Sequence, residues 1–392
     1  MKIRIDLEKE YGIVLEGGGA RGAYQVGAWK ALREAGVKIK GVAGTSVGAL
    51  NGALICMDDM EKAEEIWGNM AYSRVLNVED EMIGRLKSLG MKSVGFSELA
   101  AEVKRVVSDR GLDIGPLKEL IAETVDEEKI RKSSCEFYAT AFSVSDRKEI
   151  NFDVKAAPPG TMKDMLLASS YFPGFKNEKL GGKTYMDGGS VNNVPVNVLA
   201  DRGYKDIIVI RIYGIGVDRE RHFKLPEDVT VHRIAPRKNL GGILEFDSVK
   251  TKRNMILGYY DAMRLLYDLP GRKYYFDMPY SEGYYFDRLM SELQMLIHYF
   301  SSYLDQKDLN KISGYRPYTE KIFPALAKKF RLSAEWDYRD FYGAVLELCA
   351  RKMDLEVFHI YTADDIIGRV HKILQENNGL GELSDVWKRE KA

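Results

Sequence analysis

Hydrophobic and polar positions follow two different periods over the first 240 residues of the chain. Short runs of branched and aromatic residues predict buried strands, at residues 11–16, 37–42, 137–143, 148–154, 206–212 and 229–234. Apolar residues that recur every three or four positions predict helices between them, at residues 22–36, 47–57, 60–69, 96–107, 117–122, 162–170 and 196–202. Strands that alternate with helices are typical of an α/β layer fold with a largely parallel sheet.

Beyond residue 240 the pattern becomes helical. Apolar faces recur at helical spacing, within residues 249–267, 286–300, 341–353 and 366–374. Glycines, prolines and mixed charges between residues 214 and 242 predict a boundary there. We therefore expect a first domain over residues 9–240 and a mainly helical module over residues 241–392.

Two further segments have patterns of their own. Residues 72–95 mix charges with Met and Leu, which predicts a variable connection or lid. Residues 274–286 are rich in tyrosine and are expected to pack the second module onto the first. The alternative for this segment is an aromatic surface that meets lipid.

The motif Gly44-Thr45-Ser46-Val47-Gly48 lies between a predicted strand and a predicted helix. It has the G-x-S-x-G form of a nucleophile elbow, in which a serine occupies the sharp turn between the two elements. Gly44 and Gly48 would let the ends of the turn pass close together, where a Cβ would clash. The helix N-terminus favours negative charge that develops on Ser46. By itself, the motif also fits a glycine-rich turn without chemistry.

The run Gly17-Gly18-Gly19-Ala20-Arg21-Gly22 follows the first predicted strand. Successive glycines allow backbone N–H groups to converge on an anion, as in an oxyanion hole. The same run satisfies the dinucleotide fingerprint G-x-G-x-x-G. That site needs an acidic residue about 20 residues further on, at the end of the second strand. This chain has Gly44-Thr45-Ser46 there, which favours the oxyanion hole.

A third motif, Asp187-Gly188-Gly189, lies far downstream. Alone, its aspartate could simply cap a turn. Together with the elbow and the glycine loop, Asp187 becomes the candidate general base for a Ser46 nucleophile. A Ser-His-Asp triad stays an alternative, because a late histidine could fold back to the serine. The chain has five histidines, all after the motif-bearing half: His222, His232, His298, His359 and His371.

These three motifs, in this order, resemble those of the patatin-like phospholipases, a family of lipid acyl hydrolases. Residues 168–175 and 193–196 add to the resemblance, which covers roughly the first half of the chain. The resemblance implies a three-layer α/β/α fold with a largely parallel central sheet and a Ser46–Asp187 dyad that forms an acyl-enzyme. The backbone N–H groups of Gly18 and Gly19 would hold the oxyanion, with Arg21 nearby in sequence to reinforce them. No metal or cofactor is expected.

Composition narrows the range of partners. Lys and Arg total 58 and so do Asp and Glu, so no overall field would attract nucleic acid or an anionic membrane. The cysteines Cys56, Cys135 and Cys349 are scattered singly, which is typical of reduced structural residues. No signal peptide is visible at the N-terminus, and no stretch approaches the ~18 apolar residues of a membrane span. We expect a soluble, cytoplasmic protein whose lipid contact is peripheral; its oligomeric state stays open.

The sequence therefore predicts a serine lipid acyl hydrolase that cleaves fatty acyl esters of phospholipids or lysolipids. A thioesterase or an acyltransferase could use the same dyad on another acyl donor. From other classes, a dinucleotide-binding module could use residues 17–22, and a lipid-binding scaffold could keep the motifs without turnover.

Overall fold

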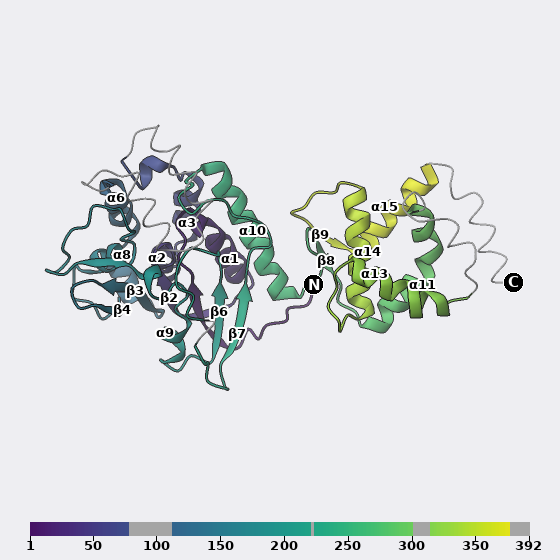
Figure 1. Cartoon of the computed structure of the whole chain (residues 1–392), viewed down its shortest axis with the longest axis horizontal. Coiled ribbons are helices and arrows are strands. Elements are labelled where there is room, and N and C mark those ends of the chain that lie inside the picture. The colour runs from purple at the N-terminus through teal and green to yellow at the C-terminus, as the bar shows by residue number, and fades with distance from the viewer. Residues whose placement is uncertain (78–111, 221–222, 301–313, 377–392) are drawn as a thin grey trace. The chain divides into compact units, whose positions relative to one another are not determined.

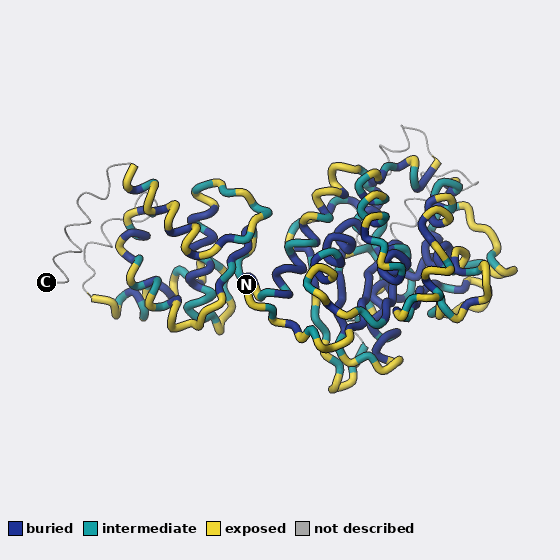
Figure 2. Tube along the Cα trace, turned by 180° about the vertical axis from the view of Figure 1, so that it is seen from behind, coloured by how far each residue is buried: buried dark blue, intermediate teal, exposed yellow. Residues whose placement is uncertain are grey.

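The computed structural model describes residues 1–77, 112–220, 223–300 and 314–376. The predicted helix at 96–107 and most of the predicted connection at 72–95 lie outside the described residues. The chain divides into two compact units, residues 4–266 and residue 267 onward, the latter joined by residues 1–3. Each unit has a buried interior of its own (Figure 2).

The first unit is built on a seven-stranded sheet in the order β4-β3-β2-β1-β6-β7, with β5 paired to β3 (Figure 1). The pairs among β3, β2, β1, β6 and β7 are all parallel, whereas β4 and β5 run antiparallel to β3. The predicted, largely parallel sheet is confirmed. Its strands are β1 (Glu10–Leu15), β2 (Lys38–Thr45), β3 (Glu136–Ser143), β4 (Lys148–Asp153), β5 (Tyr185–Asp187), β6 (Asp206–Ile210) and β7 (Thr230–Ile234).

Helices cover both faces of this sheet and make a three-layer unit. On one face, Val42 and Phe137 lie against Gly52 of α2. On the other, Val14 and Ala43 pack with Leu199 of α9 in one buried cluster. The helices of the unit are α1 (Ala23–Glu34), α2 (Val47–Met57), α3 (Met60–Gly68), α6 (Gly115–Thr124), α7 (Glu127–Lys132), α8 (Met162–Ser169), α9 (Val196–Ala200) and α10 (Ser248–Tyr267).

The first unit extends about one helix beyond the boundary expected near residue 240. Helix α10 packs into it, since the Tyr24 hydroxyl donates to the Asp261 carboxylate at 3.0 Å and the Thr251 hydroxyl to the Trp67 carbonyl at 2.7 Å. The Ala20 N–H also donates to the carbonyl of Ile243 at 2.8 Å. The glycine- and proline-containing stretch before α10 is therefore a loop held within this unit.

The second unit is mainly helical, as expected, with a short parallel pair of strands. Tyr274, Phe276 and Tyr285 of the tyrosine-rich segment are buried in its core, whereas Tyr280 and Tyr284 are exposed. The segment thus packs within its own unit. The elements are β8 (Tyr275–Asp277), α11 (Glu282–Tyr299), a π-helix (Tyr318–Ile322), α13 (Phe323–Lys329), α14 (Tyr338–Lys352), β9 (Ile360–Thr362) and α15 (Ala363–Glu376).

A search of the described residues for a helix with the length and apolar character of a membrane span finds none.

Candidate active site

Ser46 occupies the sharp turn between β2 and α2, as the elbow motif predicts. Its backbone has φ 55° and ψ −124°, a conformation that a residue with a Cβ rarely adopts. The two glycines of the motif make the turn possible, because a Cβ on Gly44 would lie 2.4 Å from the Gly48 carbonyl oxygen and one on Gly48 would lie 2.3 Å from the Leu15 carbonyl oxygen. Strain of this kind persists only where the surrounding structure enforces it.

The other elbow residues hold the turn in place. The buried Thr45 hydroxyl donates to the Asn192 carbonyl at 2.8 Å, and Val47 lines the adjoining pocket. The Ser46 N–H donates to Ser169 Oγ at 2.9 Å, and that hydroxyl donates to the Thr140 carbonyl at 2.6 Å. These contacts leave the Ser46 hydroxyl facing the pocket.

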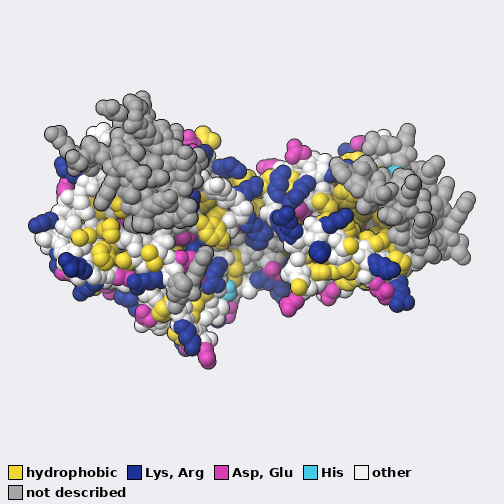
Figure 3. Space-filling view, viewed as in Figure 1, with side chains coloured by type: hydrophobic (Ala, Val, Ile, Leu, Met, Phe, Trp, Pro, Cys, Tyr) yellow, Lys and Arg dark blue, Asp and Glu magenta, His cyan; other side chains and the backbone are white. Residues whose placement is uncertain are grey.

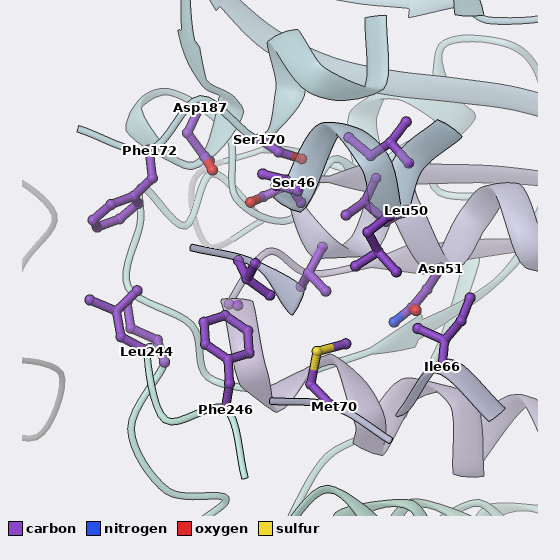
Figure 4. A pocket seen from close by; sticks show the side chains of 18 of the residues that line it. Ser46, Leu50, Asn51, Ile66, Met70, Ser170, Phe172, Asp187, Leu244 and Phe246 are labelled. Atoms are coloured by element: carbon purple, nitrogen blue, oxygen red, sulfur yellow. The ribbon is translucent and has the colours of Figure 1, made fainter. Parts of the chain in front are cut away.

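The register of the sheet places Asp187 beside Ser46. Thr45 at the end of β2 pairs with Thr140 of β3, and the next residue of β3, Ala141, pairs with Asp187 of β5. The two side chains point toward each other at one end of the pocket (Figure 4), and the Ser46 hydroxyl is close enough to lower the pKa of the Asp187 carboxyl. Residues 141 positions apart in the sequence thus meet through two neighbouring strand pairings.

The Asp187 carboxyl is 4% exposed and receives one backbone hydrogen bond, from the Gly189 N–H at 2.7 Å. Gly188 begins the short 3-10 turn that this carboxylate caps. Burial raises the pKa of Asp187 to about 6, and the hydrogen bonds from Ser46 and Gly189 oppose that rise. The carboxylate is therefore ionised at neutral pH and a stronger base than an ordinary aspartate.

The glycine loop presents two unused backbone donors to the same pocket. The Gly17, Ala20 and Arg21 N–H groups donate to the carbonyls of Asn193, Ile243 and Gly18. Within the described residues, the N–H groups of Gly18 and Gly19 have no acceptor, and both residues line the pocket with Ser46. Two such donors can hold an oxyanion.

The other residues of the predicted oxyanion run have different roles. Arg21 Nε donates to the Gly241 carbonyl at 2.8 Å, and its Nη1 to the carbonyls of Ile212 and Tyr213. The guanidinium therefore fastens two loops, whereas sequence reasoning expected it to reinforce the oxyanion site. Gly22 packs against Trp67 and Val47.

Ser46, Asp187 and Ser170 lie together at one end of the pocket (Figure 4). The rest of its wall is apolar apart from Asn51, Thr124 and Asn193. The space is about 970 Å³, including its open mouth. Asn51 also lines it, but its amide is used in hydrogen bonds to Gly22, Gln25 and Trp67. The apolar wall is formed by Leu50, Leu54, Ile66, Met70, Val75, Leu117, Leu120, Ile121, Ile243, Leu244 and Phe246, with Phe172 and Phe175.

Comparison with known proteins finds a family model that matches much of this unit. Residues 13–200 match the family model described as patatin-like phospholipase. These residues of the chain are therefore similar to the patatin-like phospholipases. The sequence-based resemblance is confirmed.

Curated relatives carry this patatin-like domain within longer chains. The chain is 26% identical over 200 residues to patatin-like phospholipase domain-containing protein 7 of Rattus norvegicus, a match that covers 51% of this chain and 13% of that protein. It is 58% identical over 50 residues to lysophospholipase nte1 of Aspergillus terreus, which covers 13% of this chain and 3% of that protein. The chain thus spans only a small part of these relatives' length.

Among solved structures, the crystal structure of VipD from Legionella pneumophila aligns with 88% of this chain and 84% of its own, at 14% identity and a TM-score of 0.38. The fold is therefore described from its own sheet topology and not from this alignment.

A buried charge network behind the glycine loop of the patatin-like domain was missed by sequence reasoning. One Glu16 carboxylate oxygen accepts from the N–H groups of Ile212 and Tyr213, at 2.6 and 2.9 Å, and from Arg211 Nε at 3.0 Å. The loop held in this way packs against Gly17 and Gly18 through Gly214. A charged residue at the end of the apolar run 11–15 was the signal that could have revealed this anchor.

Asn193 is a second positioning residue for the loop. Its side-chain amide donates to the Gly17 carbonyl at 3.1 Å, while its own carbonyl accepts from the Gly17 N–H at 3.2 Å. It also lines the pocket. Residues 193–196 contribute to the family resemblance, but no role for Asn193 was predicted from the sequence.

The structure brings none of the four described histidines to this pocket. His232 lies on β7 in the first unit, and His298, His359 and His371 belong to the second unit. His222 lies outside the described residues. Among the described residues, no cluster of three or more His, Cys, Asp or Glu is arranged to hold a metal ion.

Proposed function

We propose that this protein is a serine acyl hydrolase that cleaves fatty acyl esters of phospholipids or lysolipids. The observation that carries the proposal is that Ser46 and the buried Asp187 face each other at the polar end of a largely apolar pocket. An ester carbonyl at that end would meet a nucleophile, a base and two free N–H donors together. Its acyl chain would lie along the apolar wall.

In the proposed reaction, Asp187 accepts the hydroxyl proton of Ser46 as Oγ attacks the ester carbonyl carbon. The N–H groups of Gly18 and Gly19 hold the oxyanion of the tetrahedral intermediate. The C–O bond to the leaving alcohol then breaks, and Asp187 returns the proton to that oxygen. Asp187 next deprotonates a water as its oxygen attacks the acyl carbon. The bond between that carbon and Ser46 Oγ then breaks, and Asp187 returns the proton to Oγ as the carboxylic acid leaves.

The lipid substrate follows from the chemistry of the pocket wall, because a long apolar side suits a fatty acyl chain and offers no partner for a polar one. A relative is named a lysophospholipase, so lysolipids are the first substrates to test. The apolar wall does not favour the alternative that this site binds a dinucleotide. A thioesterase or acyltransferase would need the same residues and differs in the acyl donor or acceptor.

The test is to incubate the purified protein with a mixed lipid extract and identify the products by mass spectrometry. We expect free fatty acids and lysolipid or its deacylated product, with none formed by Ser46→Ala. Release of acid from thioesters alone, or new esters without free acid, would assign the alternatives. Dinucleotide binding without labelling of Ser46 by a fluorophosphonate would remove the protein from this enzyme class.

The pH dependence follows from the raised pKa of Asp187. Because the base must be ionised, we expect kcat/KM for a soluble neutral ester to decrease below a pH of about 6 and to level off above it. The slope on the acid side should correspond to one proton. The measurement needs circular dichroism across the same pH range to show that the fold is kept. A profile without an inflection between pH values of about 5 and 7 would argue against Asp187 as the base.

Alanine at Gly19 should damage the oxyanion site. Gly19 has φ +54°, and a Cβ there would lie 2.2 Å from the Ile243 carbonyl oxygen. The loop would have to shift, so we expect kcat to fall by about a hundredfold or more with KM little changed, because the donors act on the transition state. Steady-state kinetics on a soluble ester measure both parameters.

Gly36→Ala is the matched control for this change. Gly36 also has a positive φ, +81°, but a Cβ there meets nothing within 4 Å. The control should lose about 1 kcal/mol of stability and keep its activity. If Gly19→Ala changed KM alone, the loop would bind the substrate and would not stabilise the transition state.

A further inference from the structure

Helix α10 carries an exposed stripe in which two basic residues lie between two aliphatic ones. Val249, Lys252, Arg253 and Ile256 lie at positions i, i+3, i+4 and i+7, so they share one face of the helix. All four are exposed, and Val249 and Ile256 are 75% and 45% exposed. Within the described part of the chain, Lys252 and Arg253 form no ion pair. We call these four residues the α10 stripe.

The orientation of the α10 stripe is fixed by the opposite face of the helix. The Thr251 hydroxyl donates to the Trp67 carbonyl at 2.7 Å, and the Asn254 amide donates to the Leu240 carbonyl at 2.9 Å. Leu257 is buried on the same side. These contacts hold the stripe outward, and the fold gains nothing from two aliphatic side chains left in water.

The helix that carries the α10 stripe adjoins the wall of the pocket. Ile243, Leu244 and Phe246, just before α10, line the pocket, and so does Trp67, whose carbonyl anchors Thr251. Figure 3 shows hydrophobic side chains next to Lys and Arg side chains over the part of the first unit where Figure 1 labels α10. Helix α10 therefore directly follows a segment of the apolar wall, and its inward face contacts another residue of that wall.

We propose that the α10 stripe binds the surface of an anionic lipid bilayer. Lys252 and Arg253 would pair with lipid phosphates, while Val249 and Ile256 enter the boundary between headgroups and acyl chains. The chain has no net charge, so this attraction is local to the stripe. Binding of the stripe to a bilayer does not require catalysis. Its suggested use, to bring acyl chains to the pocket, rests on the proposed function.

The experiment uses the full-length Ser46→Ala protein, so that binding is measured without turnover. Co-sedimentation is compared between vesicles of phosphatidylcholine alone and vesicles that also contain phosphatidylglycerol. We expect binding to the anionic vesicles, weakened by added salt. Lys252→Glu with Arg253→Glu should reduce the partition coefficient by at least about tenfold. Val249→Ser with Ile256→Ser should also weaken binding.

The matched control is Arg369→Glu with Lys372→Glu on α15, which makes the same charge change at two exposed positions. It should bind as the parent does. Two results would overturn the proposal. One is that anionic vesicles bind neither the parent nor the control variant, and the other is that the control variant loses as much binding as the stripe variant. A stripe variant that changed the sedimentation coefficient of the lipid-free protein would instead assign the stripe to a second copy of the chain.

The failure of this proposal is distinguishable from failure of the proposed function. In a background with Ser46 intact, the stripe variants should hydrolyse a short soluble ester at the parental rate, because none of the four residues lines the pocket. Loss of vesicle binding with unchanged ester hydrolysis supports the surface. Absence of hydrolysis in every protein would refute the enzyme and leave the binding result standing.

Discussion

Ser46→Ala is expected to lower kcat for ester hydrolysis by at least about a thousandfold, because the variant lacks the proposed nucleophile. The exchange removes a single oxygen atom from the elbow and leaves the hydrogen bond from its backbone N–H to Ser169 in place. The protein should therefore stay folded. The measurement is kcat on a soluble ester, together with the circular dichroism spectrum.

Ser170→Ala is the matched control, since Ser170 lines the same pocket. The Ser170 hydroxyl donates to the Leu166 carbonyl at 3.0 Å, so we assign it no chemical step and expect kcat within a few-fold of the parent. Residual turnover of Ser46→Ala above about one per cent, in material free of other esterases, would move the nucleophile elsewhere.

Asp187→Asn is expected to lower kcat by about two to four orders of magnitude. The asparagine keeps the size of the side chain and can still accept the hydrogen bond that Gly189 donates, but it cannot take the proton from Ser46. Any residual activity should lack the inflection near pH 6 that the parent is expected to show. The pH profile thus separates loss of the base from a small shift in geometry.

The histidine variants are the comparison series for this prediction. Each of the five histidines replaced singly by glutamine should leave kcat within a few-fold of the parent. A folded His→Gln variant that lost a thousandfold would replace the dyad by a triad. His232→Gln is the most informative member, because His232 alone among the described histidines belongs to the same unit as Ser46.

The elbow and the glycine loop could be predicted because their constraints are local. At Gly44 and Gly48 the close approach of strand and helix is visible in the spacing of a few residues. The proximity of Asp187 to Ser46 depends on how β5, β3 and β2 pair, which no local pattern states. Both residues and their order could therefore be predicted from the sequence, while their arrangement face to face required the structure.

Two features could not be predicted from the sequence, because they depend on tertiary contacts. Glu16 ends an apolar strand, where a charge is ordinary at a surface, and only tertiary packing turns it into the anchor of the loop at Ile212. The stretch before α10 has the composition of a linker, and long loops have the same composition. Its placement in the first unit depends on contacts such as Asn254 with Leu240, which lie on different elements.

The positive φ of Ser46 has a consequence for how this chain could evolve. A non-glycine residue held in a sparsely populated conformation costs on the order of 1–3 kcal/mol of folding stability. Glycine at position 46 would adopt this positive φ without that cost. Glycine would, however, lack the hydroxyl that the proposed reaction needs, so activity and stability favour different residues at this position. Drift toward greater robustness in this lineage would therefore remove the proposed chemistry first, while leaving the fold intact.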